Sequence, residues 1–146
     1  MISNKAVIRI HGVVASTPME YEYQGEYAFE NNTHLIVYTD YTGNVITKCA
    51  IQANNESMLL HRSGAFNGEM FFQPAYPTSV KYTADMLETE MVLHTFEYCL
   101  TAEEVQHITI AFRYMLTDPH GMNVIHGQQK IDVTWVSDKR IVKSHD

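Results

Sequence analysis

The sequence has few basic residues and no long apolar run. Its 10 Lys and Arg side chains against 17 Asp and Glu give a formal charge of −7 in 146 residues. Nucleic-acid backbones and anionic membrane surfaces attract clustered Lys and Arg, so this balance argues against both partners. No stretch approaches the roughly eighteen apolar residues of a membrane-spanning helix, and the N-terminus has no apolar leader of the secretory kind. We therefore expect a cytoplasmic protein with no nucleic-acid or membrane partner.

Cysteine is scarce, and the motifs of common catalytic sites are missing. Cys49 and Cys99 lie in apolar, strand-like stretches outside any C-x-x-C motif, so we expect two reduced, buried thiols, with one disulfide between them as the alternative. The eight histidines form no H-x-H, H-E-x-x-H or Cys/His cluster, which predicts no metal site. Because G-x-S-x-G, P-loop and G-x-G-x-x-G motifs are also missing, we expect no cofactor, and an enzyme is the least favoured interpretation.

Short stretches of alternating apolar and polar residues, joined by turn signals, fill most of the chain. The clearest is residues 19–30, where apolar side chains share one face: Met19, Tyr21, Tyr23, Tyr27 and Phe29. Residues 106–116 repeat the pattern with Ile108, Ile110, Phe112, Tyr114 and Leu116. A period of two is typical of half-buried strands, and the Asn31–Asn32 pair between strands predicts a tight turn.

Residues 57–73 predict two strands that meet at a glycine corner. Phe66, Gly68, Met70 and Phe72 alternate toward one face after Gly64. Glycines at such positions permit a bend or a close backbone approach, and we expect bends at Gly25 and at Gly64–Gly68.

Residues 85–100 are the most ambiguous segment. Two sets of apolar side chains compete for the inner face, and a register shift near Glu90 would reconcile them. A helix through part of the segment is the alternative.

Nine to ten short strands in chain order, with no long amphipathic helix, predict an all-β antiparallel meander. Closure into a barrel of about 8–10 strands would remove the exposed edges that such a sheet otherwise presents. We expect one domain over residues 1–137 and a polar tail over residues 138–146. Self-association through a remaining edge strand, as in a homodimer, stays open.

Two stretches carry a family resemblance. Gly-Glu-Tyr at residues 25–27 and Arg-Ser-Gly-Ala-x-Asn-x-x-Met-x-Phe at residues 62–72 resemble the YwiB-like uncharacterised β-barrel proteins of Gram-positive bacteria. The resemblance covers residues 6–136 and implies a calycin/lipocalin-like barrel. These proteins often have a Thr-Pro-Tyr-Gly-like turn where this chain has Thr83–Met86, so that corner is expected to differ. The family is a domain of unknown function, so the resemblance implies a fold and no activity.

Arg62 is the first candidate for a binding role, because it stands beside the glycine corner and an aromatic wall. A guanidinium can hold a carboxylate or phosphate through two parallel hydrogen bonds. The alternative is structural, with the guanidinium bonding carbonyl groups to tie strand ends together.

Tyr and Met side chains dominate the predicted interior. Tyr combines an apolar ring with a hydroxyl that needs a partner when it is buried, and Met adapts to irregular spaces. This composition suits a cavity for an amphipathic ligand, but side chains can also fill a barrel of this size. The predicted ligand-binding residues are Arg62, Tyr23, Tyr27, Phe66, Met70, Phe112 and Tyr114. The favoured function is binding of a small apolar or amphipathic molecule, and the alternative is an interaction or scaffold protein with a filled core.

Overall fold

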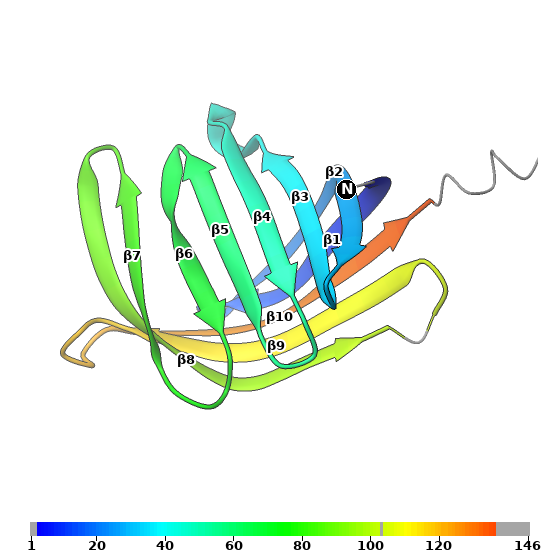
Figure 1. The fold of residues 1–146 in the computed structure, drawn as a ribbon. Coiled ribbons are helices and arrows are strands. Elements are labelled where there is room, and N and C mark those ends of the chain that lie inside the picture. The colour runs from blue at the N-terminus through cyan, green and yellow to red at the C-terminus, as the bar shows by residue number, and fades with distance from the viewer. Residues whose placement is uncertain (1–2, 103, 137–146) are drawn as a thin grey trace, which may run out of the picture.

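Ten antiparallel strands, following one another in chain order, form a closed β-barrel in the computed structural model, which describes residues 3–102 and 104–136 (Figure 1). The ring closes where the first strand pairs with the last. The elements are β1 (Asn4–Val14), β2 (Thr17–Glu30), β3 (Thr33–Asp40), the 3-10 turn η1 (Thr42–Asn44), β4 (Thr47–Ala53), β5 (Met58–Gly64), β6 (Phe66–Phe72), β7 (Thr78–Ala84), β8 (Leu87–Thr101), β9 (His107–Thr117) and β10 (Val124–Trp135). The predicted all-β meander barrel is confirmed, and the predicted polar tail lies outside the described residues. Within the described ranges, no helix is long and apolar enough to cross a membrane.

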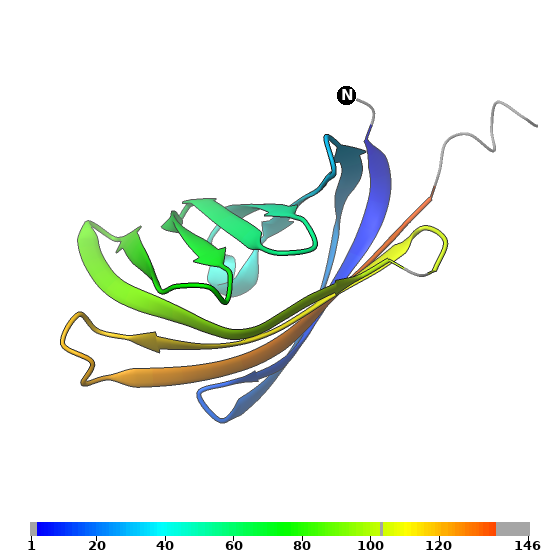
Figure 2. The same ribbon diagram turned by 60° about the horizontal axis from the view of Figure 1, so that its bottom comes forward.

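The barrel is flattened, so its wall forms two facing layers. β8, β9 and β10 run across one side, and β4 to β7 form the other (Figure 1). The turned view shows the two layers facing each other, with β1 and β2 curling between them (Figure 2). Because successive side chains of a strand point to opposite faces, every second residue of each layer points into the shared interior.

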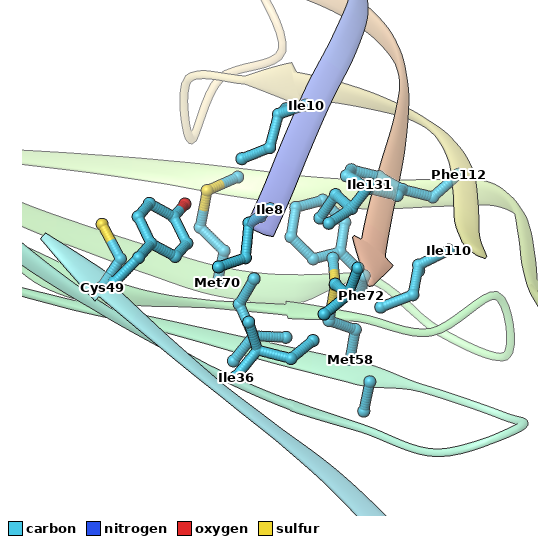
Figure 3. Packing of buried hydrophobic residues seen from close by; sticks show 14 of the residues in the cluster. Ile8, Ile10, Ile36, Cys49, Met58, Met70, Phe72, Ile110, Phe112 and Ile131 are labelled. Carbon is cyan, nitrogen blue, oxygen red and sulfur yellow. The ribbon is translucent and has the colours of Figure 1, made fainter. Parts of the chain in front are cut away.

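The interior is tightly packed toward one end of the barrel, where β2 turns into β3 and β4 into β5. We call this the packed half. Figure 3 shows Ile8 and Ile131 pointing from β1 and β10 into the interior that Ile36 and Met58 also enter. The largest fully buried side chains are Phe72, Ile8, Ile36, Ile51, Met58, Leu93, Ile108, Ile110, Val80 and Val133. Full burial of one such side chain contributes about 1.5–3 kcal/mol, so this end anchors the fold.

Three two-residue hairpins use positive backbone φ angles at both turn positions. The Asn31–Asn32 turn between β2 and β3 is confirmed, with φ of 54° and 60°. Ala15–Ser16 and Asp85–Met86 adopt the same conformation, with φ between 50° and 67°. In the corner at Thr83–Met86, Thr83 and Ala84 are the last residues of β7. Asp85 and Met86 form the turn to β8.

Residues 87–101 form one long strand, β8, that contains the expected register shift at a different place. The irregularity lies between Thr95 and Glu97, not near Glu90, and the alternative helix does not form. The extra residue at Phe96 reverses which positions face inward: Met91, Leu93 and Thr95 before it, Tyr98 and Leu100 after it. The prediction placed the shift too early in the strand. Met91 and Leu93 already share the inward face with Thr95, so the irregularity comes after them.

The two cysteines are free thiols in different surroundings. Cys49 is buried inside the barrel, whereas Cys99 is exposed. The expectation that both are buried was wrong for Cys99, because the shift at Phe96 turns the following odd-numbered positions outward.

Candidate functional site: the hollow half of the barrel

A row of residues in direct register crosses five neighbouring strands and carries most of the polar chemistry of the interior. Tyr38 pairs with Cys49, Cys49 with Arg62, Arg62 with Gly68, and Gly68 with Tyr82. Residues directly opposite each other on paired strands share one face of the sheet, and for this row that face is the inside. The strand register therefore brings a cation, a thiol and two phenols together from β3 to β7.

This row borders a cavity of about 390 Å³ in the half of the barrel opposite the packed half. Its floor is apolar and includes Ile51, Met58 and Phe72. Toward the barrel end, where β3 meets β4, Asp40 and Thr42 complete the lining. The volume lies within the range of about 300–1,000 Å³ that is typical of small-molecule sites. We call this region the hollow half.

Arg62 enters the hollow half without a protein counterion. Among the described residues, its guanidinium forms no ion pair with a carboxylate, and its buried Nε has no hydrogen-bond partner. Burial works to lower the pKa of Arg62, but the nearby Tyr82, Tyr38, Cys49 and Asp40 outweigh it and hold that pKa above its ordinary value. Arg62 is therefore a charged group with unused donor capacity.

The phenols beside Arg62 are neutral hydrogen-bond donors at ordinary pH. Burial raises the pKa of Tyr38 and of Tyr82. Burial and the nearby Asp40 carboxylate raise the pKa of Tyr23 to about 12, and its ring stacks on Tyr38 with centroids 4.5 Å apart. The Tyr82 hydroxyl is buried and has no partner in the described part of the chain.

Across the cavity, Tyr114 and Gln129 form a short polar chain. The Tyr114 hydroxyl donates to Oε1 of Gln129 at 3.2 Å, and Nε2 of Gln129 donates to the sulfur of Met19 at 3.2 Å. A thioether is a weak acceptor, so the amide of Gln129 is only weakly engaged.

Two glycines make room for the aromatic rings of this site. Gly68 pairs with Tyr82, and Gly127 pairs with Tyr114. In each case the ring of the tyrosine occupies the space that a Cβ on the glycine would need. A side chain at either position would displace a wall of the cavity.

The structure brings together five of the seven residues predicted to bind a ligand. The residues that line the hollow half are Arg62, Tyr23, Met70, Phe112 and Tyr114.

The other two lie elsewhere. Tyr27 belongs to the packed half, where its ring stacks on Trp135 with centroids 3.7 Å apart and its hydroxyl bonds Nδ1 of His34 at 2.7 Å. Phe66 stands at the start of β6 with 46% of its surface exposed. Both positions belong to the apolar, inward-facing series of their strands, but alternation does not say how far along the barrel a side chain lies.

Several cavity residues escaped the sequence prediction. Tyr38 and Gln129 follow the alternation of their strands, with Ile36 and Ile131 two positions away. Their inward orientation was therefore predictable from the sequence. The polar Gln129 near Ile131 did not by itself indicate a cavity. Asp40 and Thr42 lie at a strand end and in a turn, where no periodic pattern exists.

Within residues 3–102 and 104–136, no group of three or more His, Cys, Asp or Glu side chains is placed to hold a metal ion. The polar groups that face the hollow half instead suit an organic molecule with hydrogen-bond acceptors.

The comparisons with known proteins agree with this fold. A family model described as "Domain of unknown function (DUF1934)" matches residues 2–128. The chain belongs to this family. The family model and the structural match described next together confirm the predicted resemblance to the YwiB-like barrels. The crystal structure of ywiB protein from Bacillus subtilis matches this DUF1934 chain with a TM-score of 0.80 at 16% sequence identity, covering 92% of this chain and 94% of that chain. No curated protein matches the chain.

Proposed function

We propose that the barrel binds a small amphipathic molecule in its hollow half. The polar group of the ligand bonds the guanidinium of Arg62, and its apolar body packs on the floor made by Met58 and Phe72. The observation that carries the proposal is a charged side chain, with an unpartnered buried Nε, facing a cavity of about 390 Å³.

The volume of the cavity, about 390 Å³, suits a small molecule. A hydrogen bond to a charged partner contributes about 1.5–3 kcal/mol, and apolar burial adds about 25 cal/mol per Å². Both contributions are available here, because a cation and an apolar floor face the same space.

The chemistry of the site favours binding over catalysis. The pKa values of Tyr38 and Tyr82 are raised by burial, so these phenols donate hydrogen bonds and do not act as bases at neutral pH. Burial likewise raises the pKa of the Cys49 thiol, which keeps it a poor nucleophile.

The alternative function was a scaffold protein with a filled barrel. The packed half has the interior that such a scaffold needs, but the cavity beside Arg62 does not fit it. The two free thiols suit a reducing compartment, so we place the binding function in the cytoplasm.

Native mass spectrometry of the full chain purified from its own host tests the proposal. We expect a bound small molecule in the wild type and its loss in Arg62→Leu. Arg113→Leu is the matched control, because Arg113 is an outer-face arginine that pairs with Glu97 at 3.0 Å. A wild type that carries no molecule, and that is not stabilised by any member of a library of small amphipathic compounds, would overturn the proposal.

A further inference from the structure

The polar lining of the hollow half also specifies the charge of the ligand. We infer that the ligand is a monocarboxylate, bound as an anion by Arg62 and Tyr82. This inference rests on the proposed function and adds the chemical class of the molecule.

The charges around the cavity define the first constraint. Among the described residues that line the cavity, Arg62 is the one arginine or lysine and Asp40 is the one carboxylate. Because Asp40 already offsets the charge of Arg62, a ligand with one negative charge adds the smallest excess that an anion can bring to the site. A phosphate monoester carries about −1.5 to −2 charges at pH 7, so it would add uncompensated charge to a site that already holds Asp40. A cationic group would instead face Arg62 directly.

The donor geometry defines the second constraint. Arg62 and Tyr82 both pair with Gly68, from opposite sides, so their side chains flank a position without a Cβ. Nε of Arg62 and the hydroxyl of Tyr82 are buried, and neither has a hydrogen-bond partner in the described structure. A planar carboxylate accepts two parallel bonds from a guanidinium and keeps lone pairs for a hydroxyl donor.

Neutral polar groups satisfy these donors less well. An amide or alcohol oxygen accepts hydrogen bonds, but it brings no negative charge to the guanidinium of Arg62, which forms no ion pair among the described residues. Carboxylates are therefore the class that supplies both the missing charge and the missing acceptors. Phe72 and Phe112 line the same cavity, which suits an aromatic or branched body on the acid.

Calorimetric titration of the full chain with matched probes tests the inference. Phenylbutanoate, phenylbutanamide and phenylpropyl phosphate share one apolar body and differ in the head group. Octanoate, octanamide and heptyl phosphate repeat the comparison on a straight chain. We expect the carboxylate of each series to bind at least about tenfold more tightly than its two relatives.

Two variants assign that preference to the named donors. Arg62→Gln is expected to abolish the preference for the carboxylate, and Tyr82→Phe is expected to weaken carboxylate binding several-fold and amide binding less, because the hydrogen bond to a charged acceptor is the stronger one. Arg113→Gln, on the outer face, is expected to behave as wild type. Far-UV circular dichroism checks that each variant is folded.

The outcomes separate the two proposals. Equal binding of all three head groups, or a preference for phosphate, would overturn the monocarboxylate inference and leave the proposed function standing. A carboxylate preference that survives in Arg62→Gln would also overturn it. If no probe of either series binds, the monocarboxylate inference is overturned, and the native mass spectrometry and compound library described above decide the proposed function separately.

Discussion

Burial of the charged Arg62 side chain costs desolvation free energy, and polar neighbours rather than an ion-pair partner offset this cost. Arg62 faces an apolar floor, and its Nε has no partner among the described residues. Natural proteins retain such groups when function requires them, at a cost in stability. Arg62 thus differs from Arg113, which lies on the outer face and pairs with Glu97.

Replacing Arg62 with Met should therefore stabilise the protein. We expect Arg62→Met to raise the free energy of unfolding by about 1–2 kcal/mol, because an unpaired charge is replaced by an apolar side chain of similar length. Urea denaturation followed by circular dichroism measures the effect, with Arg113→Met expected to stay within about 0.5 kcal/mol of wild type. A clear loss of stability in Arg62→Met would show that the guanidinium ties the strands together.

The pair of Gly127 and Tyr114 gives a second prediction for single residues. The three atoms nearest to a Cβ built on Gly127 all belong to the Tyr114 side chain. Gly127→Ala should cost about 1–3 kcal/mol through overpacking, and most of this cost should vanish in the Tyr114→Ala background. A double-mutant cycle by urea denaturation measures the coupling. Additive effects would mean that the ring moves aside freely.

Among the structural elements, the hairpin between β1 and β2 is the least suited to its sequence. Ala15 and Ser16 have φ of 51° and 66°, in the left-handed region that Asn and Gly adopt more easily. Replacing the pair with Asn-Gly should raise the free energy of unfolding by about 1 kcal/mol, because this sequence favours the same turn. Thermal and urea unfolding measure the gain. The same replacement at Asn31–Asn32, where the residues already suit the turn, should change stability much less.

The sequence predicted the strands, but it did not predict where the register shift in β8 lies. Alternation identified β2, β9 and the glycine corner, because each has one buried face. The shift in β8 was placed wrongly because apolar residues stand on both sides of Phe96, and only the partner strand fixes where the extra residue lies. The alternation of β5 puts Arg62 on the same strand face as Met58 and Leu60, but the absence of an ion-pair partner depends on the positions of neighbouring strands.

At the scale of the whole molecule, buried tyrosines couple stability to alkaline pH. Burial raises the pKa of Tyr27, in the packed half, to about 12, and burial with the Asp40 charge does the same for Tyr23 in the hollow half. A group whose pKa is higher when folded than the unfolded value of about 10 stabilises the fold below that value.

The barrel should therefore lose stability as the pH rises from about 10 through about 12. Phenolate absorbance and far-UV circular dichroism, recorded together during a pH titration, should show these tyrosines ionising as the strands unfold. The double variant Tyr23→Phe and Tyr27→Phe should flatten this dependence. Full ionisation of the tyrosines in a barrel that stays folded would contradict the prediction.

The sequence also could not show that the interior is half packed and half hollow. Alternation assigns a side chain to the inside but not to a position along the barrel axis, so Tyr27 and Tyr23 looked equivalent. Their positions follow from register, because β1 pairs Tyr27 with Asn4 near its first residue and Tyr23 with Ile8 near its middle.

The chain-order arrangement of the strands has a consequence for biosynthesis. Each strand pairs with its predecessor, except that β1 must wait for β10, the final strand of the ring. A chain emerging from the ribosome can thus form hairpin after hairpin while the edges of β1 and β9 remain unpaired until residues 124–135 are released. Nascent or prematurely terminated chains should be the aggregation-prone species, and chaperones that shield bare strand edges should be most useful in that interval.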